Sequence, residues 1–273
     1  MKSLFKKVAT VVLPETFLSK FRHRRTWRWF HGDYISWAEA RAASEGYEDA
    51  AVLARVLAAT RKVRDGMASW ERDGWTFDAP EVNGPLVSVL RSIADEHERR
   101  LGVIDFGGSL GSTWWQHCRV LEEMAVVRWR VVEQQHYVAA GCEFANEVLA
   151  FYGTLDEAEL KGSSSVILFS SVLPCIEKPY ELLAEMRRRD FSHVILDRAP
   201  FVMSGSERLV VQRTPPELGG SSYPSGLFDR DRVVAALGSE FELRAEWLGT
   251  DFIDRQVEYN GLYFQRIDSK HSI

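Results

Sequence analysis

The chain has 273 residues, of which 45% are hydrophobic and 27% charged, and its formal net charge at pH 7 is −5. This length fits one large α/β domain with a substantial apolar core, and no run approaches the roughly 18 apolar residues of a membrane-spanning helix. The composition does not favour a disordered chain, and the acidic balance argues against a nucleic-acid-binding surface covering the protein.

The first 31 residues differ from the rest in charge. They carry eight basic side chains against the single acid Glu15, which gives +7 and leaves −12 for the remainder. Apolar residues such as Leu4, Phe5 and Val8 could form one side of a helix, a pattern typical of segments that lie on an anionic membrane surface. We therefore predict peripheral membrane contact through residues 1–25; the alternative is a basic arm packed on the domain or free of it.

Helical signals fill most of the first hundred residues. Ser36 and Glu39 form a capping box, which predicts a helix running to about Glu45 and ending at Gly46. Apolar residues recur at helical spacing from Asp49 to Gly66, and a third helix is expected from about 85 to 100. We assign residues 1–100 to the basic segment and a helical extension.

From Leu101 onward short apolar runs alternate with helix-like segments, which predicts βαβ units and a parallel sheet. The expected strands are 101–106, 128–133, 148–152, 165–170, 193–198, 241–248 and 259–267. The expected helices are 112–124, 136–146, 179–189 and 229–237. We assign residues 101–273 to one α/β domain.

Residues 199–228 interrupt this alternation with four prolines and four glycines. A long connection without regular structure in a compact domain is usually a binding loop or lid, so we predict a lid or acceptor loop here. The alternative is an ordinary excursion containing a short hairpin.

The first predicted strand of this domain leads into a glycine-rich loop, Val103-Ile-Asp-Phe-Gly-Gly-Ser-Leu-Gly-Ser112. Glycines allow a sharp turn and a close approach to a ligand, and the free amides at a helix start favour a polar or anionic group. The spacing is neither the dinucleotide fingerprint nor a phosphate loop with its lysine. Asp105 would repel a phosphate and suits a ligand with a positive end.

Asp105-Phe-Gly-Gly-Ser-Leu-Gly111 resembles the first motif of class I S-adenosylmethionine-dependent methyltransferases, an acid followed by alternating glycines, with Ser109 in place of the middle glycine. The resemblance implies a Rossmann-like sheet of seven mostly parallel strands flanked by helices, and S-adenosylmethionine as cofactor. Glu133, at the end of the next predicted strand, would accept the ribose hydroxyls, and Ser170 and Ser171 would lie beside the methionine part. The implied cofactor-binding residues are Asp105, Phe106, Gly107, Gly108, Ser109, Gly111, Glu133, Gln134, Ser170 and Ser171.

Further segments extend the resemblance over nearly the whole chain. Gly32 to Ala40, Gly66 to Asp73, Leu196 to Phe201 and Ser222 to Pro224 are similar to a bacterial family classed as methyltransferases and found with surface-polysaccharide biosynthesis genes. This resemblance implies a sugar or surface-glycan component as acceptor.

Methyl transfer to a hydroxyl benefits from a general base, and near neutral pH histidine or a carboxylate can fill that role. The candidates are His117, His136 and Asp197, while Arg198, Gln212 and Tyr223 are candidates for the acceptor site. No cluster of His, Asp and Glu at ligand spacing predicts a metal.

We therefore expect an S-adenosylmethionine-dependent O-methyltransferase acting on a small-molecule or glycan acceptor. Three cysteines without Cys-x-x-Cys spacing indicate a reducing compartment, so we expect the protein in the cytoplasm, with membrane attachment at the inner face as an added hypothesis. One rival is a non-catalytic binding or scaffold protein that retains the fold; a second is a nicotinamide-dependent oxidoreductase, against which the loop spacing and Asp105 both count.

Overall fold

The computed structural model of the chain describes residues 29–46, 50–160, 165–215, 220–249 and 257–267. The predicted membrane-contacting segment, residues 1–25, lies outside these ranges, so that contact stays a prediction. Among the helices of the described residues, none combines the length and the apolar character needed to cross a membrane.

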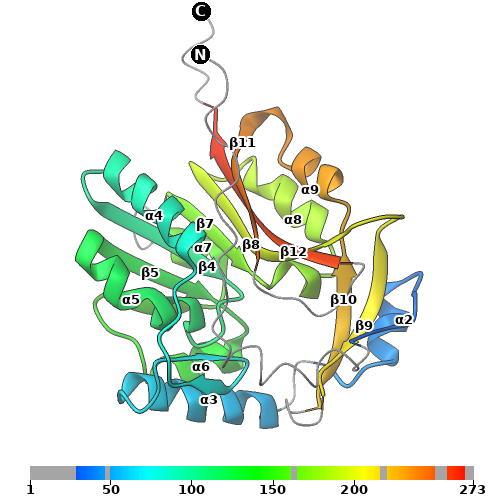
Figure 1. The fold of residues 1–273 in the computed structure, drawn as a ribbon, viewed down its shortest axis with the longest axis horizontal. Helices are drawn as coiled ribbons and strands as arrows, with labels where there is room; N and C mark the ends of the chain where they lie inside the picture. Colours follow the sequence, from blue (N-terminus) through cyan, green and yellow to red (C-terminus); the bar gives the residue numbers. More distant parts are fainter. Residues whose placement is uncertain (1–28, 47–49, 161–164, 216–219, 250–256, 268–273) are drawn as a thin grey trace, which may run out of the picture.

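A seven-stranded sheet forms the centre of the molecule (Figure 1). Its strand order is β11-β12-β8-β7-β4-β5-β6. The strands are β4 (Arg100–Phe106), β5 (Val126–Val132), β6 (Leu149–Tyr152), β7 (Val166–Ser170), β8 (His193–Val202), β11 (Phe241–Leu248) and β12 (Val257–Arg266). Strands β6, β5, β4, β7 and β8 pair in parallel, whereas β12 runs antiparallel to both β8 and β11.

Helices cover both faces of this sheet. One face packs against α3 (Ala50–Arg64), α4 (Gly84–Glu96), α5 (Ser112–Met124) and α6 (Gln135–Gly141), and the other against α7 (Leu155–Leu160), α8 (Pro179–Met186) and α9 (Arg230–Ala236). Neighbouring strand residues alternate between the two cores, since Val103 belongs to the first and Ile104 to the second. Both residues are fully buried.

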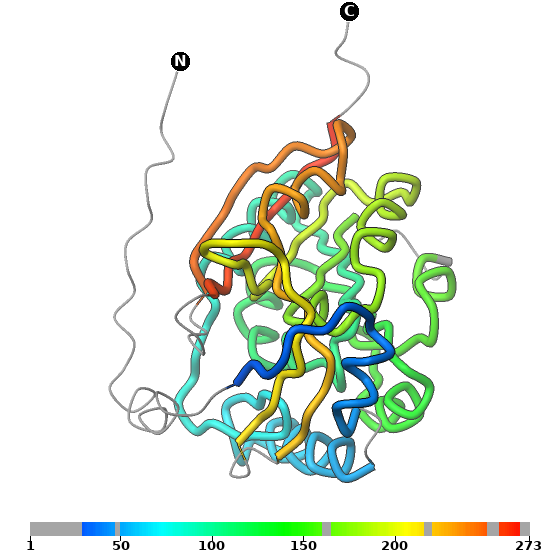
Figure 2. The backbone as a smooth tube through the Cα atoms, turned by 90° about the vertical axis from the view of Figure 1, so that its right-hand side faces the viewer, coloured from blue at the N-terminus to red at the C-terminus, as the bar shows by residue number. Residues whose placement is uncertain are grey.

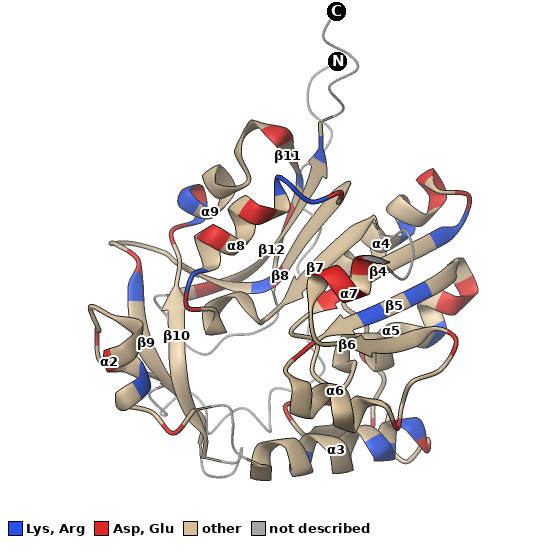
Figure 3. Ribbon diagram, turned by 180° about the vertical axis from the view of Figure 1, so that it is seen from behind, with Lys and Arg blue, Asp and Glu red and all other residues tan. Residues whose placement is uncertain are grey.

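Among the outer helices, α7 and α8 carry acidic residues only, whereas α9 carries both signs (Figure 3). Several charged residues form ion pairs between neighbouring elements. Arg189, after α8, pairs with Asp156 and Glu159 of α7, and Arg230 of α9 pairs with Glu246 of β11. These contacts join the helices of one layer to each other and to the sheet edge.

The N-terminal elements follow the predicted capping box. Helix α2 (Trp37–Ala42) begins after Ser36, whose hydroxyl accepts a hydrogen bond from the Glu39 amide, while the Glu39 carboxylate accepts one from the Ile35 amide. Between α3 and α4 the chain forms a two-stranded hairpin, β2 (Trp70–Arg72) and β3 (Trp75–Phe77). The sequence does not predict this hairpin, because each strand has only three residues and two of the three in β2 are charged.

A second, three-stranded sheet lies beside the main one, in the order β1-β9-β10. It joins β1 (Phe30–His31) to β9 (Arg208–Arg213) and β10 (Ser222–Leu227), segments far apart in the sequence that lie side by side in Figure 2. Residues 199–228 are therefore not a connection without regular structure, which corrects that part of the prediction. Strands β9 and β10 pair antiparallel, from Ser222 opposite Arg213 to Leu227 opposite Arg208, so the segment contains a hairpin, as the alternative expected. Its role as a lid or acceptor loop stays a prediction.

All seven predicted strands of the main sheet are present, and α5 has its predicted bounds. Helices α6 and α8 end earlier than predicted, at Gly141 and Met186, and α7 was not expected. The predicted Rossmann-like fold, a seven-stranded mostly parallel sheet flanked by helices, is confirmed. The predicted boundary between extension and domain at residue 100 stays a prediction.

Candidate functional site

The glycine-rich loop connects the carboxyl end of β4 to the start of α5. Gly107, Ser109 and Gly111 all have positive φ angles, of 69°, 56° and 84°. Gly107 donates a backbone hydrogen bond to Val132 of the neighbouring strand β5 at 2.9 Å. The loop thus sits at the edge of the sheet where ligands of open α/β folds bind.

Two loop glycines make room for the protein itself. A Cβ on Gly107 would lie 2.2 Å from the Val172 side chain, and one on Gly108 would lie 2.5 Å from the Asp105 carboxyl group. We expected the loop glycines to clear space for a ligand; at these two positions the space is filled by Val172 and Asp105. The glycines therefore shape the loop that a ligand would meet.

Asp105 lies beneath this loop and is fully buried. Its Oδ2 accepts a hydrogen bond from Trp129 Nε1 at 3.0 Å, whereas its buried Oδ1 has no hydrogen-bond partner. Burial, helped by the nearby charge of Glu133, raises the pKa of the Asp105 carboxyl to about 7, against the Trp129 hydrogen bond and the charge of Arg198, which lower it. A positive ligand nearby would favour the ionised form of this carboxyl.

Glu133 follows β5 and holds the other side of the loop. Its Oε1 accepts a hydrogen bond from the Ser109 amide at 3.2 Å, and its Oε2 accepts one from the Gln134 amide at 2.8 Å. Burial raises the pKa of Glu133, while these two backbone hydrogen bonds lower it. Each oxygen keeps a lone pair for a further donor, such as a hydroxyl.

Asp197, in the middle of β8, is the centre of a polar network beside Ser170, the last residue of β7. Its side chain is 3% exposed. Its Oδ1 accepts a hydrogen bond from Asn83 Nδ2 at 3.0 Å, and its Oδ2 accepts one from Ser170 Oγ at 2.8 Å. Arg198 completes the network, with its Nε 3.5 Å from Asp197 Oδ2 and its Nη2 donating to Ser170 Oγ at 3.1 Å.

Next to this network, His117 is buried in α5 with both ring nitrogens engaged. Nδ1 lies 2.8 Å from the Thr113 carbonyl oxygen, to which it donates, and Nε2 accepts a hydrogen bond from the Asn83 amide at 3.0 Å. Burial lowers the pKa of His117 to about 4. The ring is therefore neutral near pH 7 and its lone pair is occupied, so the geometry gives the predicted role as a base no support.

His136, the third candidate base, is exposed near the start of α6. It lines a hollow of about 490 Å³ together with Gln134, Gln135 and the α3 residues Ala50 and Leu53. The hollow adjoins Glu133 in the chain. Among the described residues, no hydrogen bond or ion pair joins His136 to the Asp197 network, so the structure does not bring the three candidate bases together.

The predicted acceptor residues lie on three strands, β8, β9 and β10. Arg198 belongs to the Asp197 network, whereas Gln212 of β9 and Tyr223 of β10 face each other as a pair in the second sheet. Strand β10 contacts the 3-10 helix η2 (Leu173–Cys175), which follows Ser170 and Ser171. The second sheet thus borders the same edge of the main sheet.

Two residues of this region were missed by the sequence reading. Asn83 caps α4 by accepting a hydrogen bond from the Leu86 amide, and it also contacts both Asp197 and His117. Glu71 of β2 is 1% exposed and contacts Ser112, the first residue of α5. Asn83 stands two positions before a proline and a helical run, a pattern that could have indicated its role as the cap of α4. The long-range contacts of Asn83 with Asp197 and of Glu71 with Ser112 have no signal in the sequence.

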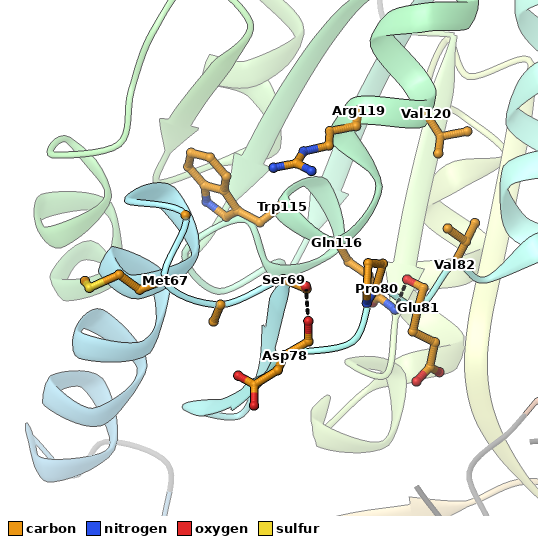
Figure 4. A pocket seen from close by; sticks show the side chains of 12 residues that line it. Met67, Ser69, Asp78, Pro80, Glu81, Val82, Trp115, Gln116, Arg119 and Val120 are labelled. Atoms are coloured by element: carbon orange, nitrogen blue, oxygen red, sulfur yellow. Dashed lines mark hydrogen bonds between the residues drawn. The ribbon is translucent and has the colours of Figure 1, made fainter. Parts of the chain in front are cut away.

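A second hollow, of about 350 Å³, lies on the outer side of α5 (Figure 4). Trp115, Gln116 and Arg119 form one wall, and the segment from Asp78 to Val82 forms the opposite one. Gln116 Nε2 donates to the Glu81 carbonyl at 3.2 Å across the hollow, and Trp115 Nε1 donates to the Leu110 carbonyl of the glycine loop. These contacts support the loop from behind.

The described residues contain no group of three or more His, Cys, Asp or Glu side chains placed to hold a metal ion.

No protein-family model matches the sequence, and no curated protein matches it either. Among solved structures, the N-terminal domain of EvdMO1 in the presence of SAH and D-fucose has a TM-score of 0.47 and 18% identity, covering 76% of this chain and 95% of that one. The glycopeptide N-methyltransferase MtfA complexed with S-adenosylmethionine has a TM-score of 0.45 and 13% identity, covering 66% and 94%. A SAM-dependent methyltransferase from Methanosarcina mazei has a TM-score of 0.44 and 10% identity, covering 64% and 97%. At these TM-scores and sequence identities the likeness gives no information about chemistry. A proposal about function therefore has to rest on the residues of this chain.

Proposed function

We propose that this chain is an S-adenosylmethionine-dependent methyltransferase that methylates a hydroxyl of a sugar or surface-glycan component. The observation that carries the proposal is the arrangement around the glycine loop. A buried carboxyl, Asp105, lies beneath the loop with one oxygen unpaired, and a second carboxylate, Glu133, closes the loop through the Ser109 amide. Both stand at the carboxyl ends of adjacent parallel strands.

These residues suit the cofactor chemically. S-adenosylmethionine supplies a methyl group on a positively charged sulfur, together with a cationic amino group. Carboxylates favour such charges, and the free lone pairs of Glu133 can accept ribose hydroxyls. The hollow between α3 and the start of α6, lined by Gln134 and His136, gives room beside Glu133 for the nucleoside end.

At the acceptor side, Asp197 is our candidate for the proton acceptor. Ser170 Oγ donates to Asp197 Oδ2, and Ser170 is partly exposed. The serine hydroxyl can therefore take the proton of an acceptor hydroxyl while the serine's own proton passes to Asp197. When bound, the cofactor would supply the methyl group, whose bond to sulfur would break as its bond to the acceptor oxygen formed. Arg198, Gln212 and Tyr223 are proposed to hold the acceptor, and most of the rate would come from positioning.

Calorimetry with S-adenosylmethionine and S-adenosylhomocysteine tests the cofactor. We expect binding by the wild type and at least about tenfold weaker binding by Asp105→Asn, because the amide removes the charge at nearly the same volume. Glu122→Gln, an exposed position on α5, is the matched control and should bind as the wild type does. No binding by the wild type would refute the proposal.

One observation favours the alternative, a binding or scaffold protein that does not turn over. Both Asp197 oxygens and both His117 nitrogens are already engaged. Conversion of S-adenosylmethionine to S-adenosylhomocysteine in the presence of a panel of glycans and nucleotide sugars separates the two functions. Binding without any turnover would favour the scaffold.

We also propose that residues 1–25 attach the protein to anionic membranes, which would suit an acceptor built on a lipid carrier. Co-sedimentation with vesicles containing anionic lipid should be lost on deleting residues 1–25 and at high salt. Unchanged co-sedimentation of the deletion variant would refute this part.

A further inference from the structure

Glu71 is a buried carboxylate outside the residues assigned above to cofactor or acceptor. Its Oε1 accepts a hydrogen bond from the Ser112 hydroxyl, and its Oε2 accepts one from the Gly74 amide at 3.1 Å. The side chain therefore joins three segments that the sequence separates: strand β2, the β2–β3 turn and the first residue of α5.

The start of α5 has no capping side chain of its own. Its N-cap residue is Gly111, with φ of 84°, so no side chain from that position can accept a hydrogen bond from the first helical amides. A carboxylate close to the first turn of a helix is favoured by the helix dipole. Glu71 supplies this charge from the hairpin and is hydrogen-bonded to Ser112 directly after the glycine loop.

The loop is thereby held from two sides. Glu133 accepts a hydrogen bond from the Ser109 amide in its middle, and Glu71 accepts one from Ser112 at its end. The Gly74 contact also fixes the adjoining turn, in which Asp73 and Gly74 both have positive φ angles and the Asp73 side chain is exposed. The hairpin turn and the glycine loop therefore form one connected unit.

We propose that Glu71 is a positioning residue for the cofactor, which holds the end of the glycine loop and whose negative charge strengthens binding of a cationic ligand. This inference rests on the proposed methyltransferase function. It goes beyond that function because Glu71 belongs to neither of the strands that carry Asp105 and Glu133.

The charge on Glu71 depends on its neighbours. Ser112 faces it from α5, Arg72 and Asp73 lie beside it on the hairpin, Tyr137 of α6 is in electrostatic range, and Arg55 of α3 lies against Gly74. Burial raises the pKa of Glu71 to about 7, against the hydrogen bonds from Ser112 and Gly74. The carboxylate thus becomes charged as the pH rises through 7. An effect of its charge on cofactor binding should therefore depend on pH, whereas an effect of packing alone should not.

The test is calorimetry with S-adenosylmethionine at pH 6 and pH 8.5 on wild type, Glu71→Gln and the exposed control Glu122→Gln. A neutral glutamate and a glutamine are close in shape, so we expect wild type and Glu71→Gln to agree within about twofold at pH 6. At pH 8.5, where only the wild type carries the charge, Glu71→Gln should bind about tenfold more weakly. Glu122→Gln should follow the wild type at both pH values.

The other outcomes overturn either this inference alone or the proposed function together with it. If the wild type binds and Glu71→Gln matches it at both pH values, or is weaker by the same factor at both, the inference is overturned while the proposed function stands. If the wild type does not bind at all, the proposed function fails first and the inference with it.

A second variant covers a failure of Glu71→Gln to fold, judged by circular dichroism. Ser112→Ala keeps the charge and removes one contact to it, so we expect about threefold weaker cofactor binding at both pH values and faster hydrogen exchange of the 107–113 amides. Unchanged affinity and exchange would overturn the proposal.

Discussion

Ser109 occupies a left-handed backbone conformation, with φ of 56°, in which a side chain is disfavoured by about 1 kcal/mol. Its backbone amide is the group that donates to Glu133, so the loop keeps this hydrogen bond whichever small residue stands at position 109. The serine in place of the glycine that the motif usually has is thus tolerated by the geometry.

Ser109→Gly should therefore leave the free energy of unfolding unchanged or raise it by up to about 1 kcal/mol, and should retain cofactor binding. Ser109→Val places a β-branched side chain at the same φ and should cost about 2 kcal/mol while weakening binding. Urea unfolding and calorimetry on both variants measure this, and a Val variant as stable as the Gly variant would contradict it.

His117 links two helices through its ring, so its expected role differs from that of a base. His117→Gln can keep one donor toward Thr113 and one acceptor toward Asn83, and we expect it to fold with a loss of about 1–2 kcal/mol in unfolding free energy. Turnover of a methylated acceptor should stay within a few-fold of the wild type. Loss of turnover with cofactor binding intact would instead identify His117 as the base.

Among the elements, the start of α4 is joined to the middle of β8. Asn83 both caps α4 and donates to the buried Asp197 carboxylate. Asn83→Ala removes both contacts and should lower the unfolding free energy by about 2 kcal/mol. The exposed α4 substitution Ser88→Ala is the control, with an expected change under about 1 kcal/mol; equal unfolding midpoints for the two variants would contradict the coupling.

The sequence predicted those elements whose signals are local and strong. Buried parallel strands such as β4 and β7 read as continuous apolar runs because both faces are covered by helices. Asp105 and the loop were singled out because they form one contiguous motif at the end of a predicted strand, and Glu133 because it ends the next predicted strand. Their role in cofactor binding stays a prediction.

Elements and residues defined by distant partners were not predicted. The strands β2 and β3 are too short to show a period, and the prolines and glycines of 199–228 obscured the pairing of β9 with β10. Glu71 meets Ser112 across 41 residues, and Asn83 meets Asp197 across 114. Such contacts follow from the packed fold, which a single sequence does not display.

For the whole molecule, buried ionisable groups of two kinds determine how stability varies with pH. Burial raises the pKa values of Glu71 and Asp105 to about 7, so the native state keeps protons there that the unfolded chain has lost. Burial lowers the pKa values of His117 and His193 to about 4, so there the unfolded chain binds protons that the native state lacks. The acids make stability fall with rising pH, and the histidines make it rise.

The two trends oppose each other between about pH 4.5 and 6.5, and only the acids act above that, because the histidines are then neutral in both states. We expect the free energy of unfolding to vary little between pH 5 and 6.5 and to fall between pH 6.5 and 8. Denaturant unfolding of the ligand-free protein across this range is the measurement. The free energy of unfolding of Glu71→Gln should fall less steeply over this range. A wild type that gains stability from pH 6.5 to 8 would refute this account.

The second sheet also sets an order for events during synthesis. Glu45, just after α2, donates its amide to Ser222 Oγ, a partner 177 residues further along the chain. A ribosome adding roughly 5–20 residues per second delivers that partner roughly 10–35 s later. Until then Trp29 and Phe30, buried in the finished protein against Val210 and Leu227, have no sheet to pack on. The second sheet can therefore form only once β10 has been made, with β11 and β12 of the main sheet still to follow. A nascent-chain chaperone can meet Trp29 and Phe30 throughout that interval.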